Sequence, residues 1–325
     1  MQDVTDHAFM RLISQKGAPD FFMTEYFRVY AGSRPEAHIL ECIERNETGR
    51  PIIAQLLGHD IENLVATIRA LETRPIAGID LNLGCPAPKV YRKNVGGGLL
   101  SDLGRIKEIL TALRENYTGH LSIKTRVGFE NADDFERLLD IVEASGIDMF
   151  TLHARSVRAL YRGAVDYEKI ARAATRLTNI RVVANGDITS AAKAAWVRAH
   201  TNCTGVMIGR SALRNPWIFR QIRELSEGSR VFEPTLADVH AYVHEIWEQL
   251  SNARHPESVR LGRVKKFLNF VGQSIDAHGN FLKAMRTTKN ARELFDVCEA
   301  HLGVANAPLP FATEPFAGVI ARPNC

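Results

Sequence analysis

The sequence predicts an α/β protein in which a (β/α)8 barrel is followed by a small all-α domain. Between residues 21 and 210, short β-rich segments alternate with amphipathic stretches long enough to form helices, which is typical of repeated parallel βα units. Polar residues follow the ends of five of these segments, where such barrels carry their chemistry. After Arg210 only helical periodicity continues, to about Leu302.

Seven β-strands are predicted, each with the apolar character of a strand buried on both faces. They cover residues 21–26, 51–57, 78–83, 121–126, 149–153, 181–184 and 205–208. A closed TIM (β/α)8 barrel needs eight strands. Residues 3–16 have the pattern of the first helix, with Asp3 or Thr5 as its cap, and almost nothing precedes them. We therefore expect that the first strand is truncated, because an open sheet leaves unpaired edges.

The segments between the strands predict helices that pack on the barrel. Apolar residues recur every three or four positions in residues 61–71, 104–115, 133–144, 167–177 and 190–199, and we interpret these stripes as core. A Gly/Ser/Pro-containing stretch over residues 226–234 separates a barrel domain, residues 1–225, from a helical domain, residues 235–302. Residues 303–325 have little periodicity, which predicts an extended or disordered tail.

Composition narrows the class of protein. The five cysteines are scattered and never form Cys-x-x-Cys, so neither a disulfide framework nor a metal site is predicted. No apolar run reaches the roughly 20 residues that a bilayer requires, and no basic-then-apolar signal segment begins the chain, so we expect a cytoplasmic protein without a membrane partner. The net charge of +4 permits a polyanionic partner without requiring one. We expect a monomer.

One thiol follows the end of a predicted strand. Residues 79–86 read Ile-Asp-Leu-Asn-Leu-Gly-Cys-Pro, which leads from an alternating strand into a tight turn that carries Cys85. A thiol there can act as a general acid or, once deprotonated, as a nucleophile. A small residue at a turn is the alternative interpretation, and Cys85 alone does not decide between the two.

Polar side chains also follow the neighbouring predicted strands: Gln55, Asn82, Lys124, Arg126, His153, Arg155, Asn185 and Asp187. Any single one is explained as a hydrogen-bonded structural residue, whereas their convergence on one rim favours a site. Glycine in residues 184–187 and 208–211, together with Arg210, favours a phosphorylated ligand. Gln55 suits the pyrimidine edge of a flavin, and Lys124 suits its N1–C2=O region when the ring is reduced.

Two basic regions extend this hypothesis. Residues 89–98 combine Lys89, Arg92 and Lys93 with a tyrosine and a Gly triplet, which predicts a mobile lid that holds phosphates; a solvated charged loop is the alternative. The helical domain has basic residues at helix-compatible spacing: Arg260, Arg263, Lys265, Lys266, Lys283, Arg286, Lys289 and Arg292. Such faces are often only solvated, but near a cationic rim they favour a groove for a phosphate backbone.

These motifs resemble the signature of tRNA-dihydrouridine synthases. The signature residues are Asp80-Leu81-Asn82-Leu83-Gly84-Cys85-Pro86 with Lys89 and Gly96-Gly97-Gly98. The similarity continues through Val4-Thr5-Asp6, Gln55-Leu56-Leu57-Gly58, Lys124-Thr125-Arg126, His153-Ala154-Arg155, Asn185-Gly186-Asp187 and Gly209-Arg210, and reaches about residue 300.

The resemblance implies an oxidoreductase that uses FMN, re-reduced by NADPH, to convert specific uridines of tRNA to 5,6-dihydrouridine. Reduced FMN would deliver hydride to uracil C6 while Cys85 protonates C5 from the opposite face. It implies cofactor contacts by Gln55, Lys124, His153, Asn185, Gly186, Asp187, Gly209 and Arg210. It also implies contacts by Met1 and Gln2, the only residues of the expected first-strand region that are left in this sequence. It implies substrate or tRNA contacts by Asn82, Lys89, Arg92, Lys93, Arg126, Arg155, Arg263, Lys265, Lys266 and Arg286.

Two other functions are considered. A flavin-dependent reductase of free pyrimidines would share the barrel and the thiol but would need no basic helical domain. A tRNA-binding protein that has lost catalysis would not need Cys85, Lys124 and the glycine-containing phosphate segments. If tRNA is the substrate, its target base must be flipped out of the stack into the barrel mouth.

Overall fold

A computed structural model describes residues 4–250 and 255–321 of the chain. The chain divides into two compact units. We call Met1–His7, Asp20–Ile188 and Trp196–Met207 the barrel unit, and Ala8–Pro19, Thr189–Ala195 and Ile208–Cys325 the helical unit. Among the described residues, no helix has the length and apolarity needed to cross a membrane.

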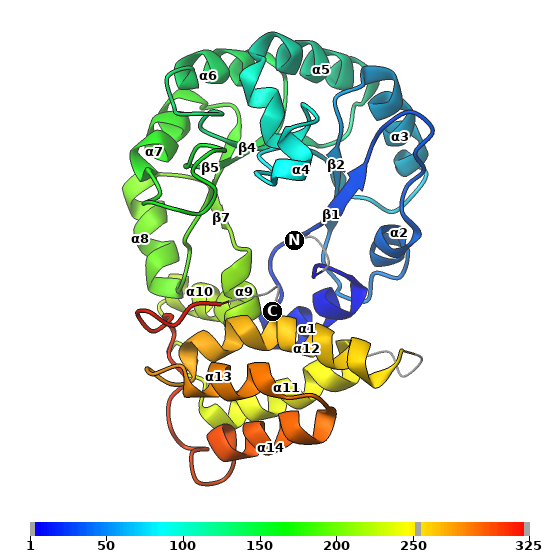
Figure 1. The fold of residues 1–325 in the computed structure, drawn as a ribbon. Helices are drawn as coiled ribbons and strands as arrows, with labels where there is room; N and C mark the ends of the chain where they lie inside the picture. Colours follow the sequence, from blue (N-terminus) through cyan, green and yellow to red (C-terminus); the bar gives the residue numbers. More distant parts are fainter. Residues whose placement is uncertain (1–3, 251–254, 322–325) are drawn as a thin grey trace. The chain divides into compact units, whose positions relative to one another are not determined.

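The barrel unit contains a seven-stranded parallel sheet in which every strand pairs with the next one along the chain. The strands are β1 (Phe22–Arg28), β2 (Ile52–Leu57), β3 (Gly78–Leu83), β4 (Leu121–Arg126), β5 (Met149–His153), β6 (Arg181–Asn185) and β7 (Gly205–Met207). Figure 1 shows that the sheet curls and that helices follow on its outer side. A curled parallel sheet with alternating helices confirms the predicted TIM-barrel architecture.

The helices between these strands are amphipathic and bury one side. They are α2 (Ala37–Glu44), α3 (Ile61–Glu72), α5 (Leu103–Asn116), α6 (Phe135–Ala144), α7 (Tyr167–Arg176) and α8 (Ala191–Thr201). In α3, for example, Leu64, Ile68 and Leu71 are fully buried, which is the three- and four-residue spacing of a helix face. Asp60 caps this helix by accepting a hydrogen bond from the backbone N–H of Asn63.

The interior of the sheet is layered because side chains alternate along each strand. One cluster is apolar and joins Ile53, Met149 and Val183 from three strands. Two residues further along the strands, the same register places Gln55 opposite Asp80, and Asp80 opposite Ser122. The next positions towards the carboxyl ends are polar as well, with Asn82 opposite Lys124. The sheet therefore changes from apolar to polar towards the end at which barrels of this class carry their sites.

β1 departs from this regular register. Met23 lies opposite Ile53, but Tyr26 lies opposite Gln55, so β1 has one residue more than β2 in this interval. Such a β-bulge bends a strand and re-aims the side chains that follow it. The strand runs from Phe22 to Arg28, two residues beyond the predicted end at residue 26.

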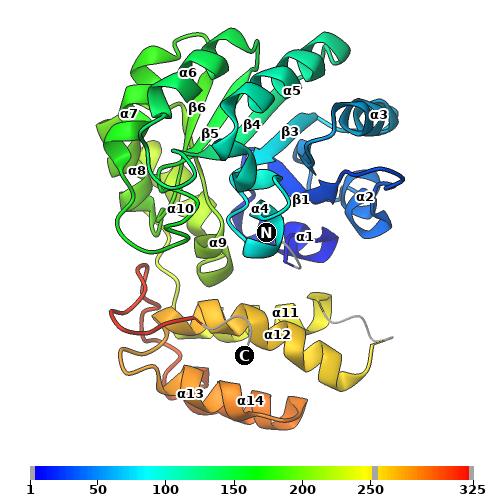
Figure 2. The ribbon, with the colours of Figure 1, turned by 45° about the horizontal axis from the view of Figure 1, so that its top comes forward.

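The helical unit is built from α1 (His7–Gly17), of which all but His7 belongs to it, and six helices after β7. These are α9 (Arg210–Arg214), α10 (Ile218–Ser226), α11 (Leu236–Leu250), α12 (Glu257–Val271), α13 (Asn280–Thr287) and α14 (Ala291–Leu302). Figure 2 shows α11 beside α12, and α13 leading into α14. The side chains of Tyr242, Phe267 and Phe281 are fully buried in this unit.

Residues 303–321 are irregular but hydrogen-bonded to the helical unit. The backbone N–H of Leu236 donates to the carbonyl of Leu309 at 2.9 Å, and that of Phe311 donates to Pro234 at 2.8 Å. Buried Arg214 donates to the side chain of Ser274 at 2.7 Å and to the carbonyl of Thr313 at 2.9 Å. The described part of the tail thus packs against its own unit.

Candidate active site

The carboxyl ends of β2 to β6 carry most of the polar residues that the sequence singled out. The parallel register sets Asn82 beside Lys124, Arg126 beside His153, and His153 beside Asn185. All of these residues belong to the barrel unit. Met1 and Gln2, which were predicted to contact the cofactor, lie outside the described residues.

A buried carboxylate, which the sequence analysis missed, organises this end of the sheet. Asp80 has no solvent exposure; its Oδ2 accepts a hydrogen bond from Gln55 Nε2 at 2.8 Å and its Oδ1 accepts one from Ser122 Oγ at 2.7 Å. Burial raises the pKa of Asp80 to about 6, although the two hydrogen bonds and the charge of Lys124 oppose this rise. An acidic residue inside a buried strand was the available signal.

From Asp80 a chain of hydrogen bonds leads to the thiol-bearing turn. Because the Gln55 amide group donates its hydrogen bond to Asp80, its Oε1 is directed to Asn82 and accepts a hydrogen bond from Asn82 Nδ2 at 2.9 Å. Asn82 Oδ1 in turn accepts from the backbone N–H of Gly84 at 3.1 Å and of Cys85 at 2.5 Å. The network thus fixes both carboxamides and, through Asn82, the backbone of Cys85.

Cys85 is partly exposed and its sulfur is a free thiol. It packs against a buried cluster of Tyr26, Leu57 and Val90. Its carbonyl accepts a hydrogen bond from the backbone N–H of Gly97 at 3.0 Å. The other described cysteines, Cys42, Cys203 and Cys298, are buried. Cys85 is therefore the thiol among them that a substrate could reach.

The Gly triplet does not form the flexible part of a lid, so that interpretation was wrong. Gly96, Gly97 and Gly98 begin the short helix η1 (Gly96–Ser101) and are buried. A Cβ on Gly97 would lie 2.7 Å from Val157 Cγ2 and 2.9 Å from the Cys85 carbonyl oxygen. The triplet allows close packing behind the thiol, while Lys89 in α4 (Pro88–Tyr91) and the following Arg92 and Lys93 are exposed.

Lys124 lies at the end of β4, in register with Asn82. Desolvation lowers the pKa of Lys124 to about 8, and the nearby charge of Arg126 adds to this, while Asp80 and Cys85 oppose it. Its ammonium group forms no hydrogen bond or ion pair within residues 4–250 and 255–321. This desolvated cation therefore suits an acceptor on a bound ligand.

The guanidinium groups of Arg126 and Arg155 brace the loop of residues 156–163. Arg126 is 1% exposed; it donates to the carbonyl of Gly84 at 3.0 Å and to those of Ser156 and Leu160 at 2.8 and 2.6 Å. Arg155 donates to the carbonyl of Gly163 at 3.0 Å and forms an ion pair with Asp187. These contacts favour bracing of the loop over the predicted direct contact with substrate.

The segment after β6 lies against His153. Gly186 has φ +111°, and a Cβ there would lie 2.9 Å from His153 Cδ2, so only glycine lets the backbone pass the imidazole ring. Asn185 Nδ2 donates to the carbonyl of Met207 at 2.9 Å, which ties β6 to β7. Gly209 and Arg210 begin α9 and belong to the helical unit.

Glu25 is a second carboxylate that the sequence analysis did not single out. It is buried, and its Oε1 accepts hydrogen bonds from the backbone N–H groups of Val4 at 2.7 Å and Thr5 at 3.0 Å. It thereby anchors the segment that follows Met1 and Gln2.

Comparison with known proteins identifies the class to which this arrangement belongs. Residues 1–303 match the model of the Dihydrouridine synthase (Dus) family. The chain belongs to the dihydrouridine synthase family. This confirms the resemblance seen in the sequence motifs, and the match continues through the helices that follow the sheet.

Curated relatives agree with the family match. The chain is 34% identical over 239 residues to tRNA-dihydrouridine synthase B of Pasteurella multocida, covering 73% of this chain and 71% of that one. It is 30% identical over 307 residues to tRNA-dihydrouridine(16) synthase of Neisseria meningitidis serogroup B, covering 91% of both. It is 29% identical over 310 residues to tRNA-dihydrouridine synthase B of Escherichia coli K12, covering 93% and 94%.

In this dihydrouridine synthase, the basic residues of the helical unit that are predicted to bind tRNA lie on α12 and α13. Lys265 Nζ donates to the carbonyls of Arg286 and Thr288, each at 2.8 Å. Arg286 donates to Asn269 Oδ1 at 2.9 Å and to the carbonyl of Ile320 at 2.7 Å. The other two, Arg263 and Lys266, are partly exposed, and burial lowers the pKa of Arg263. Lys265 and Arg286 thus tie α12 to α13.

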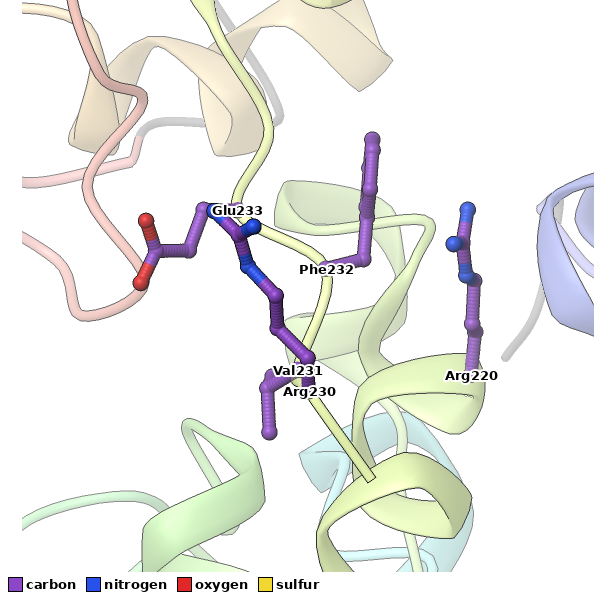
Figure 3. A pocket seen from close by; sticks show the side chains of 5 residues that line it. All are labelled: Arg220, Arg230, Val231, Phe232 and Glu233. Carbon is purple, nitrogen blue, oxygen red and sulfur yellow. The ribbon is translucent and has the colours of Figure 1, made fainter.

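A pocket of about 280 Å³ lies in the helical unit, lined by Arg220, Arg230, Val231, Phe232 and Glu233 (Figure 3). The Arg220 guanidinium carbon lies 4.2 Å from the centroid of the Phe232 ring. None of the residues predicted for the active site lines it. Among the described residues, no group of three or more His, Cys, Asp or Glu side chains could hold a metal ion.

Proposed function

We propose that this dihydrouridine synthase reduces the C5–C6 double bond of specific uridines in tRNA, with FMN as its cofactor and NADPH as the reductant. The single observation that carries the proposal is the presentation of Cys85. Its backbone is fixed by Asn82 at the carboxyl end of a barrel strand, beside the desolvated ammonium of Lys124. A proton donor and an unpartnered cation at one strand edge suit the addition of hydrogen to a polarised double bond.

The residues at this edge fit a flavin phosphate ester. Lys124 offers a cation to the N1–C2=O region of the ring, and Gln55 lies two strands away, on β2, with its carboxamide fixed by Asp80 and Asn82. Gly186 keeps the backbone beside His153 free of a side chain, which suits close approach of a ligand. When bound and reduced, FMN would supply the hydride that adds to uracil C6.

We further propose that Asn185, Gly186 and Asp187 hold the phosphate of FMN; the resemblance also implies cofactor contacts by Gly209 and Arg210 and by Met1 and Gln2. Backbone N–H groups in glycine-containing turns and an arginine are the usual partners of such a phosphate. Glu25 supports the N-terminal part of this proposal, because it anchors the backbone at Val4 and Thr5.

Cys85 acts in this proposal as the general acid. The S–H bond of Cys85 breaks as the new C5–H bond of the base forms, which leaves a thiolate. Asn82 positions this thiol by accepting from the backbone N–H of Cys85, and the close packing of Gly97 on the Cys85 carbonyl holds the turn from behind. Asn82 therefore contributes by orienting the acid as well as through any contact with the base.

The tRNA reaches this thiol by base flipping, since C5 and C6 are inaccessible within a stack. The exposed cations Lys89, Arg92 and Lys93 follow Cys85 directly in the chain and supply phosphate contacts. Residues 235–302 supply the second basic surface, through Arg263, Lys265, Lys266 and Arg286, while residues 1–225 carry the chemistry. The protein works as a monomer in the cytoplasm, where thiols stay reduced.

The test combines a spectrum with a product analysis. The purified protein should absorb between 300 and 500 nm as a flavoprotein, and it should form dihydrouridine in unmodified tRNA when NADPH is added. Product from free uracil at a similar rate would instead indicate a reductase of free pyrimidines. Tight tRNA binding with neither flavin nor product would overturn the proposal in favour of a tRNA-binding protein.

A further inference from the structure

The pocket in the helical unit is lined by none of the residues predicted to bind cofactor, substrate or tRNA. It is formed by Arg220 of α10 and by residues 230–233, which lie within the stretch that was predicted to separate two domains. Its volume of about 280 Å³ is just below the roughly 300–1,000 Å³ of pockets that hold drug-sized ligands. The pocket therefore admits a group of about the size of one nucleotide.

The aromatic wall of this pocket is held in place by α10. The backbone N–H of Phe232 donates to Glu224 Oε2 at 2.7 Å, and its carbonyl accepts from Nε2 of buried Gln221 at 2.8 Å. The Phe232 ring also packs on buried Trp217, with 5.8 Å between the ring centroids. Both polar groups of the Phe232 backbone thus have partners on α10, which fixes the position of the ring.

Arg220 presents its guanidinium group in a fixed orientation. Its Nε donates to Glu224 Oε1 at 2.6 Å, and its guanidinium carbon lies 4.2 Å from the centroid of the Phe232 ring. Within the residues that the structure describes, its two terminal amino groups form no hydrogen bond. Stacking on an aromatic ring leaves such amino groups available to a ligand, and they suit a phosphate, which guanidinium groups bind with two parallel hydrogen bonds.

Arg230 and Glu233 lie on the other side of the Phe232 ring (Figure 3). Both side chains are exposed, and in the described part of the chain neither forms a hydrogen bond or an ion pair. The pocket thus combines two cations with one carboxylate, which repels a phosphate unless the ligand also carries a hydrogen-bond donor. The ribose of RNA has such a donor close to its phosphate, the 2′-hydroxyl, and DNA lacks it.

We propose that this pocket binds one nucleotide of the tRNA. Arg220 and Arg230 bind the phosphate, Glu233 accepts a hydrogen bond from the 2′-hydroxyl, and the base packs on the Phe232 ring. An acidic peptide fits less well, because its carboxylates would face Glu233. The inference rests on the proposed function for the identity of the partner, tRNA, but it does not depend on flavin chemistry.

The first experiment measures the affinity of the full chain for unmodified tRNA and for DNA of the same sequence. Arg230→Ala should weaken tRNA binding about tenfold and lower the salt dependence of binding by about one counterion, because one contact to a phosphate is lost. Arg198→Ala on α8 is the matched control, since Arg198 is exposed and has no hydrogen bond or ion pair within the described residues. It should leave the affinity for tRNA within about twofold of the wild type.

Glu233→Ala separates a ribonucleotide site from a general anion site. Removal of the carboxylate should strengthen binding to DNA, because a repulsion is lost, while in tRNA the 2′-hydroxyl also loses its acceptor. We therefore expect the ratio of tRNA affinity to DNA affinity to fall about fivefold. Photo-crosslinking with tRNA that contains 4-thiouridine locates the site independently, and it should label the tryptic peptide that begins at Val231.

These measurements need neither flavin nor turnover. A wild type that binds tRNA but forms no dihydrouridine would contradict the proposed function alone. Unchanged tRNA affinity in Arg230→Ala would overturn the inference alone. An unchanged affinity ratio in Glu233→Ala would also overturn it, in favour of a general anion site, and so would crosslinks confined to other peptides.

Discussion

The substitution Asp80→Asn tests whether a buried carboxylate organises the site. Asp80 is fully buried, and its pKa rises from 3.8 to about 6 on folding. A carboxyl with a raised pKa binds more protons in the folded state, so its contribution to stability is greatest at low pH and is lost as the pH rises through about 6. Since one pKa unit is worth about 1.4 kcal/mol, the wild type should lose about 2 kcal/mol relative to Asp80→Asn between pH 4.5 and 7.5.

The assay is urea unfolding of both proteins across this range, with the difference in free energy of unfolding plotted against pH. Asp60→Asn is the control, because hydrogen bonds from Asn63 lower the pKa of Asp60, which is partly exposed. The stability that Asp60 contributes is present above its unfolded pKa, so the difference between wild type and Asp60→Asn should stay constant from pH 4.5 to 7.5 and disappear only at lower pH. A stability difference between wild type and Asp80→Asn that does not change with pH would refute the reasoning.

The same substitution should lower activity by a separate route. An Asn at position 80 can present an amide donor to Gln55, which reverses the Gln55 carboxamide and breaks its hydrogen bond with Asn82, now 2.9 Å long. The backbone of Cys85 then loses a fixed acceptor. We expect the rate of product formation to fall roughly tenfold or more, with the fold retained and flavin binding weakened, because both the orientation of the acid and that of the Gln55 carboxamide are disturbed.

Two further predictions concern residues next to the thiol. Gly97→Ala should lower the free energy of unfolding by about 1–3 kcal/mol in urea denaturation and slow product formation, because its Cβ would meet Val157 at 2.7 Å and the Cys85 carbonyl at 2.9 Å. Gly104→Ala is the control, because its Cβ would meet nothing closer than 3.4 Å; it should be neutral or slightly stabilising, since Ala favours the exposed helix α5 over Gly. Lys124 has a pKa lowered to about 8, so its charge is present below pH 8 and lost above it, and flavin affinity measured by fluorescence titration should weaken as the pH rises from 7 to 9. Lys124→Met should weaken flavin binding at pH 7 and remove this pH dependence. A pH dependence of flavin affinity that persists in Lys124→Met would contradict the assignment.

The sequence was sufficient for the parts of the fold that depend on periodicity. Buried parallel strands are continuous apolar runs bounded by turns, so residues 78–83 and 121–126 were predicted with the bounds that the structure has. The position of Cys85 after the end of β3 followed from the same pattern. The bulge in β1 could not be predicted, because one extra residue in a strand leaves no periodic trace.

The site was less predictable where a residue's role depends on what it packs against. A Gly triplet has the same sequence whether its glycines are flexible or tightly packed, and only the approach of Val157 and the Cys85 carbonyl decides between these. An arginine after a strand can bind phosphate or backbone carbonyls, and the conformation of residues 156–163 gives Arg126 carbonyl partners. Long-range contacts of this kind are set by the folded structure rather than by local pattern.

The most direct test of the account is a single-turnover comparison of wild type with Cys85→Ala. Both proteins are reduced in advance and mixed with unmodified tRNA, and dihydrouridine is measured against time. If Cys85 is the general acid, the variant should bind flavin and tRNA normally but form product at least about a hundredfold more slowly. Product formation by the variant at the wild-type rate would contradict the central claim that this thiol protonates the base.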